Sequence, residues 1–115
     1  MRTKITFVFL IMVLLTACAS SNTTPTQVVP LSGNVDVTIS NYAFSPADLT
    51  VKVGTVVTWT NQDSVVHNVT ATDNSFASND LNQGDKFTYT FNTAGTFPYR
   101  CGFHANMKAT VTVVP

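Results

Sequence analysis

Residues 87–91 read FTYTF and residues 97–101 read FPYRC, with the sequence NTAG at 92–95 between them. In both short runs, aromatic or other apolar residues alternate with their neighbours, which places them on one face of an extended chain. Asn, Thr and Gly in the intervening segment are residues that favour turns. This part of the chain therefore predicts two β-strands joined by a turn.

Similar strand patterns recur along the rest of the chain from residue 34. They lie at 35–39, 49–53, 56–60, 65–71 and 109–114, with turn residues between them. Of the 82 residues from 34 to 115, 26 are Val, Ile or Thr, and the protein contains no Glu. This composition favours strands over helices. We predict an all-β fold, an antiparallel Greek-key β-sandwich of about seven to eight strands.

The first seventeen residues, 1–17, have the pattern of a secretory signal peptide. Two basic residues precede an apolar run at 5–15, which is too short to span a bilayer. The run ends in LTAC at 15–18, which resembles a bacterial lipobox, in which Cys18 is lipidated and becomes the new N-terminus. Plain cleavage is the alternative, because small residues also flank the cysteine. Both interpretations predict export: a membrane-anchored lipoprotein facing the periplasm or cell surface, or a soluble periplasmic or secreted protein.

Residues 18–33 are rich in Ser, Thr, Asn and Pro, so we expect a lipidated N-terminus followed by a flexible linker. Residues 34–115 form the predicted domain, which we expect to be monomeric. Without the signal, four basic residues stand against six Asp, which gives a net charge of −2. No basic patch is present in such a sequence, which argues against nucleic acid as a partner.

The possible metal ligands of the domain are few and clustered. It contains two His, one Cys and one Met, namely His67, His104, Cys101 and Met107. Three of them form a Cys-x2-His-x2-Met pattern at 101–107, between two predicted strands. A thiolate and two imidazoles with a weak axial thioether are the ligand set of blue-copper electron-transfer sites. We therefore expect one type 1 copper, with Met107 as the axial ligand.

Each of these residues taken alone has a more ordinary interpretation. A single Cys in a β domain is usually a small buried hydrophobe, and in an exported protein it is often half of a disulfide. Cys101 has no partner for a disulfide within the chain if Cys18 is lipidated or removed. A single Met usually fills the core, and a single His usually lies at the surface. The joint spacing favours the ligand interpretation.

The pattern of residues 35–114 resembles the cupredoxins, the plastocyanin and amicyanin family. The short gap between the second His and the Met is similar to amicyanin rather than to plastocyanin. The resemblance implies that the backbone N–H of Asn68 donates to the Cys101 sulfur and that its side chain ties two loops together. Phe103 and Ala109 depart from the family, which commonly has Pro and Gly there. The likeness rests on Phe44-x-Pro46, Val57-x-Trp59-x-Asn61, His67-Asn68 and Tyr99-x-Cys101-x2-His104-x2-Met107.

The resemblance implies a one-electron carrier, not an enzyme, that exchanges electrons with exported or membrane redox partners such as a cytochrome, a dehydrogenase or an oxidase. His104 is the expected port for electrons, with Phe103 and Phe76 around it as an apolar patch. A copper-binding or copper-delivery protein without electron transfer would use the same ligands. An adhesion or assembly sandwich with accidental ligands is a third possibility. A copper enzyme is disfavoured, because the sequence has no further His for a second copper centre.

Overall fold

The computed structural model describes residues 17–19 and 24–115. The predicted signal at 1–17 therefore lies outside the described residues except for Ala17. Among the described residues there is no helix that could span a membrane. The described residues form eight strands: β1 (Asn34–Ser40), β2 (Ala43–Ser45), β3 (Asp48–Lys52), β4 (Thr55–Asn61), β5 (Thr70–Ala71), β6 (Lys86–Phe91), β7 (Gly95–Arg100) and β8 (Lys108–Val114).

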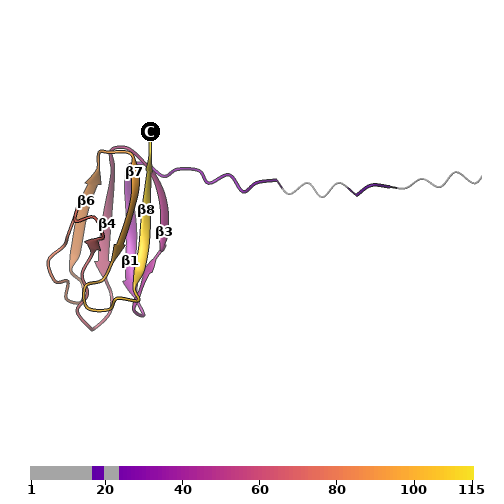
Figure 1. Ribbon diagram of the computed structural model, residues 1–115. Helices are drawn as coiled ribbons and strands as arrows, with labels where there is room; N and C mark the ends of the chain where they lie inside the picture. Colours follow the sequence, from indigo (N-terminus) through magenta and orange to yellow (C-terminus); the bar gives the residue numbers. More distant parts are fainter. Residues whose placement is uncertain (1–16, 20–23) are drawn as a thin grey trace, which may run out of the picture.

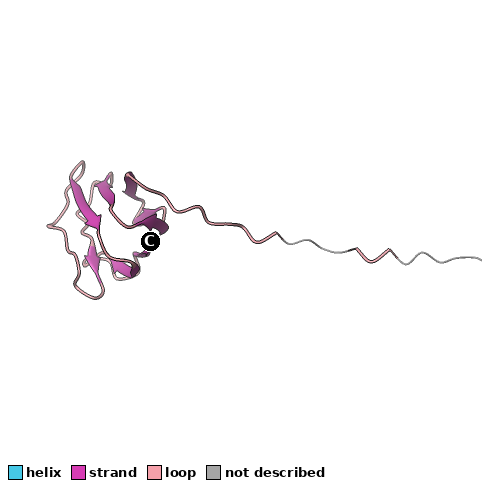
Figure 2. Cartoon of the chain, turned by 90° about the horizontal axis from the view of Figure 1, so that it is seen from above, coloured by secondary structure: helices cyan, strands magenta, loops and turns pink. Residues whose placement is uncertain are grey.

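The strands form two four-stranded sheets that pack face to face (Figure 1), with strand orders β2-β1-β4-β6 and β3-β8-β7-β5. This arrangement, seen from above in Figure 2, confirms the predicted all-β sandwich. The pairs β1–β4 and β3–β8 are parallel, whereas the other paired strands are antiparallel. After β2 the chain crosses to the second sheet as β3 and returns as β4, so β4 runs alongside β1 in the same direction. The sheets are therefore mixed rather than wholly antiparallel.

Alternation along the strands sends one side-chain face into the space between the sheets. In β4, the side chains of Val57, Trp59 and Asn61 are all buried. Trp59 lies among aromatic rings, with the ring centroids of Phe87 and Tyr99 at 5.6 and 5.5 Å. Burial raises the pKa of Tyr99 to about 12, because a phenolate loses its hydration in an apolar core.

The segment 65–71, predicted as a strand, is mostly a loop. Only Thr70–Ala71 joins a sheet, as β5 beside β7. His67 instead forms an isolated bridge with Leu81, in the long polar segment that precedes β6. The backbone groups of His67 are thus paired outside both sheets, which leaves its side chain at one end of the sandwich. The three-residue strand β2 was not predicted, because so short a run carries little periodicity.

Backbone contacts with the sandwich begin at Leu31, before the predicted domain boundary at residue 34. The N–H of Leu31 donates to the carbonyl of Thr50 at 2.9 Å, and its carbonyl accepts from the N–H of Lys52 at 2.8 Å. β1 then runs along the sandwich (Figure 1). It has seven residues, and the rise per residue of a strand places its two ends about 20 Å apart. The N-terminal tail and the turn that follows β1 therefore lie at opposite ends of the domain.

Candidate metal centre

The loop between β7 and β8 carries three of the four predicted ligands. Cys101 directly follows β7, and Met107 directly precedes β8. The N–H of Cys101 donates to the carbonyl of Met107 at 3.1 Å, and the N–H of Met107 donates to the carbonyl of His104 at 2.9 Å. These two hydrogen bonds close the loop on itself, so two paired strands determine where its side chains lie.

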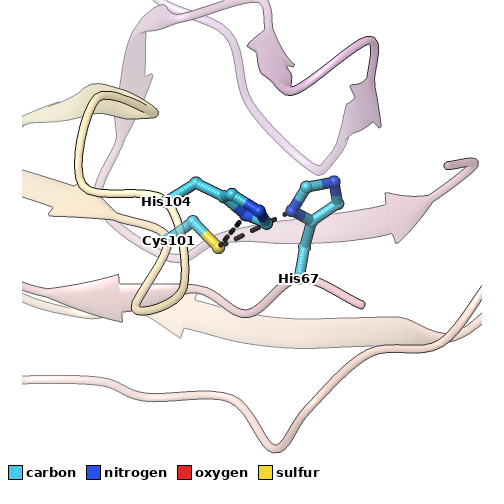
Figure 3. A group of neighbouring side chains, drawn as sticks. All are labelled: His67, Cys101 and His104. Carbon is cyan, nitrogen blue, oxygen red and sulfur yellow. Dashed lines mark hydrogen bonds between the residues drawn. The ribbon is translucent and has the colours of Figure 1, made fainter. Parts of the chain in front are cut away.

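His67 reaches the same place from the connection between β4 and β5. Its backbone exchanges two hydrogen bonds with Leu81, at 3.1 and 2.7 Å. The side chains of His67 and Cys101 are fully buried, whereas His104 is partly exposed. Figure 3 shows the three side chains pointing toward one another.

The donor atoms are spaced as a single metal ion requires. Sγ of Cys101 is 3.7 Å from Nδ1 of His67 and 3.8 Å from Nδ1 of His104. The donor atoms of the three residues all lie within 4.8 Å of one another. A metal about 2.0–2.3 Å from a sulfur and a nitrogen, at trigonal angles, holds these two donors about 3.7 Å apart. The three residues therefore fit one ion, and a thiolate with two imidazoles suits copper.

Met107 completes the predicted ligand set at the end of the loop. It is 2 % exposed, and its backbone bonds to both Cys101 and His104. A thioether held away from water at the end of this loop suits the long axial position of a blue-copper site. The structure thus gathers all four residues at one end of the sandwich.

Asn68 links the segment of His67 to the loop of Cys101. Its backbone N–H donates to Sγ of Cys101 at 3.5 Å. Its side-chain Oδ1 accepts from the N–H of Gly102 at 2.6 Å, and its Nδ2 donates to Asp80 at 3.5 Å. This is the arrangement that the family resemblance implies. A hydrogen bond to the sulfur stabilises the charge of a thiolate and so tunes a metal bound to it.

Asp63 contacts the far side of the His67 ring. From the sequence, Asp63 was expected only to be part of the turn between two predicted strands. Its Oδ2 lies 2.8 Å from Nε2 of His67. The backbone N–H of Tyr42, and then the His67 ring, hold the pKa of the Asp63 carboxyl below its usual value, against the opposing effect of burial. An ionised carboxylate only accepts, so Nε2 carries the proton and Nδ1 keeps its lone pair for a metal. No pattern in the sequence marks this contact, because a four-residue spacing brings two side chains together on a helix and this segment is a loop.

Tyr42 is a second residue that sequence reasoning missed. Its ring lies edge-on to the rings of both His67 and His104, with centroids 5.4 and 5.0 Å apart. Tyr42 is nevertheless 49 % exposed. No motif marks this residue, because its contact with the histidines arises from the meeting of distant segments.

The predicted apolar patch around His104 is half correct. Phe103 is 49 % exposed beside His104. Phe76 is 4 % exposed and packs against Trp59 and Tyr89 inside the sandwich, so it does not belong to the surface. A single apolar residue in a polar segment has no periodic pattern around it. The sequence therefore did not indicate whether the side chain of Phe76 faces the core or the solvent.

Comparison with known proteins agrees with this geometry. Residues 5–113 match the family described as a cupredoxin-like domain. Amicyanin-alpha of Methylorubrum extorquens is 31% identical over 87 residues, which are 71% of this chain and 73% of that protein. Plastocyanin of Scenedesmus fuscus is 35% identical over 83 residues, 61% of this chain and 85% of that protein.

A solved structure described as a novel purple cupredoxin from Nitrosopumilus maritimus has the same fold. It superposes with a TM-score of 0.66 at 36% identity, over 70% of this chain and 99% of that one. The family match at residues 5–113 includes the strands and the loop that carry the site. The chain belongs to the cupredoxin-like family, and its clustered histidines, cysteine and methionine are positioned to bind one copper ion.

Proposed function

We propose that this protein is a one-electron carrier with a single type 1 copper, held by His67, Cys101 and His104 with Met107 as the axial ligand. The observation that carries this proposal is the convergence of the Cys101 sulfur on the Nδ1 atoms of His67 and His104 at 3.7 and 3.8 Å, with Cys101 and His67 fully buried. Copper supplies the one-electron chemistry, because its two oxidation states both accept this mixed sulfur and nitrogen set.

The chain itself supplies rigidity and access. Strands β7 and β8 hold the loop of Cys101, and the bridge to Leu81 holds His67. Ligands that cannot move between two oxidation states keep the reorganisation on electron transfer small. The part-exposed ring of His104 offers an electron path to the surface, and Phe103 offers an apolar contact beside it. Transient redox partners meet over small interfaces, so a modest patch suffices.

The test is the colour of the copper-loaded domain. Charge transfer between the Cys101 thiolate and Cu(II) should give an intense visible band. Cys101→Ala should abolish this band, whereas Cys18→Ala, the matched control at the other cysteine, should keep it. A copper-loaded wild type without the band would refute the type 1 site. A blue protein with very slow electron self-exchange would favour copper delivery instead.

We expect no enzymatic turnover from this domain. The sequence contains only two His, and both belong to the site described above. A second, His-rich copper centre of the kind that copper oxidases use would therefore lack ligands. Catalytic consumption of nitrite or oxygen by the copper-loaded protein would contradict this expectation.

We also propose that the protein is exported and anchored through a lipid on Cys18, and that it acts as a monomer. Cys18 is exposed, and the tail joins the sandwich at the end opposite to the metal centre. An anchor at that end would leave His104 facing away from the membrane toward a redox protein. Cys18→Ala should shift the protein from the membrane to the soluble fraction or leave its signal unprocessed, with Ser20→Ala as the control. A wild type that is wholly soluble after export would support plain cleavage.

A further inference from the structure

The turn between β1 and β2 has an unusual residue at its second position. Asn41 and Tyr42 form this two-residue turn, and both have positive φ, 53° and 58°. Turns of this type favour Asn followed by Gly, because both positions need left-handed backbone. Asn tolerates that conformation, whereas a bulky aromatic residue there is strained by about 1–3 kcal/mol. Tyr42 is therefore locally unfavourable, which points to a role for its side chain.

Asp63 holds this turn in place. Its Oδ1 accepts from the N–H of Asn41 at 2.7 Å, and its Oδ2 accepts from the N–H of Tyr42 at 3.0 Å. The same Oδ2 lies 2.8 Å from Nε2 of His67. One carboxylate thus fixes both residues of the turn and the ring of a metal ligand.

The ring of Tyr42 completes the link to the second histidine. The rings of Tyr42, His67 and His104 contact one another pairwise, with centroids 5.4, 5.0 and 5.0 Å apart. Both contacts of Tyr42 are edge-on, at 87° and 88°. Edge-to-face packing of this kind is favourable and restricts the rotation of the rings. His104 lies on a part-exposed loop, and Tyr42 gives its ring a fixed neighbour.

We propose that Asp63 and Tyr42 form a brace that sets the orientation of both imidazoles before copper binds. Asp63 acts on His67 directly and on His104 through Tyr42. The brace rests on the proposed function, because it presupposes that the two histidines are copper ligands. Preorganised ligands bind metal more tightly and rearrange less when the metal changes its oxidation state.

A carboxylate is the group that this position requires. Three N–H donors converge on its two oxygens, and an ionised carboxylate has acceptor sites for all of them. An amide has only one oxygen. In Asp63→Asn the NH₂ group must therefore face at least one of these N–H groups, donor against donor, and that hydrogen bond is lost. If that NH₂ faces His67, the proton of the ring moves to Nδ1, the nitrogen that faces Cys101. The substitution then blocks a metal-binding atom without changing the size of the side chain.

The experiment compares four variants with wild type. Asp63→Asn tests the carboxylate, and Asp73→Asn is its control, because Asp73 also accepts a turn N–H, from Ser75 at 2.9 Å, without contacting a histidine. Tyr42→Gly suits the turn but removes the ring, whereas Tyr42→Phe keeps the ring. Nitrogen NMR of the copper-free protein reports the tautomer of His67. Copper titration and the visible and EPR spectra report affinity and geometry.

We expect Asp63→Asn to weaken copper binding about 10–100-fold. Its NH₂ must face either the His67 ring, whose tautomer then shifts, or the N–H of Asn41, which loosens the turn that carries Tyr42. Tyr42→Gly should remain folded, yet change the visible and EPR spectra. Tyr42→Phe and Asp73→Asn should match wild type in every readout. Wild-type tautomer, affinity and spectra in either Asp63→Asn or Tyr42→Gly would overturn the brace, since the proposal needs both residues. If the copper-loaded wild type lacks the intense visible band, the proposed function is refuted instead. This outcome is read from the wild type alone and does not depend on the variants.

Discussion

The side-chain oxygen of Asn68 accepts a hydrogen bond from the backbone N–H of Gly102 at 2.6 Å, between residues 34 positions apart in the chain. The backbone N–H of Asn68 also donates a hydrogen bond to the sulfur of Cys101. A Cβ atom at residue 102 would lie only 3.0 Å from both Nδ2 and Oδ1 of Asn68. The close approach of these two segments therefore depends on the absence of a side chain at Gly102.

Gly102→Ala should displace Asn68 and strain the loop. We expect the copper-free protein to lose about 1–3 kcal/mol of unfolding free energy, as is usual when a tight contact is overfilled. The visible copper band should shift, because the Asn68 N–H moves relative to the sulfur. Chemical unfolding and absorption spectra measure both effects. Ala105→Ser, which adds one atom at an exposed position of the same loop, should change neither.

Met107 should set the reduction potential more than it holds the metal. Met107→Leu should raise the potential, because the loss of a donor disfavours Cu(II). Met107→Gln should lower it, because a harder amide oxygen stabilises Cu(II). Voltammetry of the copper-loaded variants measures the two shifts. A potential unchanged in both variants would mean that Met107 only fills the core.

Asp63 should make the copper-free fold sensitive to acid. Its pKa is lowered from 3.8 in the folded protein, foremost by the N–H of Tyr42. A carboxyl whose pKa is lower when folded stabilises the fold above its unfolded pKa, and this stabilisation is lost as the pH falls through the folded pKa. The unfolding free energy of wild type should therefore fall more steeply below about pH 4 than that of Asp63→Asn. Urea unfolding over a pH series measures the difference, and parallel curves would contradict it.

Two like charges face each other across β7 and β8. Arg100 and Lys108 are directly paired in register, and both are exposed. Directly opposed like charges are destabilising, so Lys108→Glu should raise the unfolding free energy by about 0.2–1 kcal/mol. The gain should shrink at high salt, which screens exposed charges. Lys52→Glu is the control, because the exposed Lys52 is paired with the uncharged Val114.

Phe103 should matter for electron exchange and little for stability. It is 49 % exposed, so Phe103→Ala should change the unfolding free energy by no more than about 0.5 kcal/mol. Electron self-exchange should slow, because the apolar contact beside His104 is lost. Val53→Ala, at a 43 % exposed residue next to β3, is the matched control at the other end of the domain. Equal exchange rates in wild type and Phe103→Ala would place the electron port elsewhere.

The amino-acid sequence alone indicated the all-β class and the four residues that are candidates for binding copper. The alternation at 87–91 and 97–101 is a local property, because side chains two residues apart share a face of any strand. The ligands His67, Cys101, His104 and Met107 could be named because the domain contains no other His, Cys or Met. When so few candidates exist, composition and spacing are enough.

Only the tertiary structure decided what surrounds those ligands. The parallel pairing of β1 with β4, the burial of Phe76, and the meeting of Asp63 with the turn at Asn41 and Tyr42 involve segments far apart in the chain. Asp63 and Tyr42 are 21 residues apart, and no pattern in the sequence around either residue indicates that they are in contact. Local periodicity indicates which face of a strand is apolar. Which distant segments meet depends on how two whole sheets pack, because that packing maximises burial over the entire core rather than over any one segment.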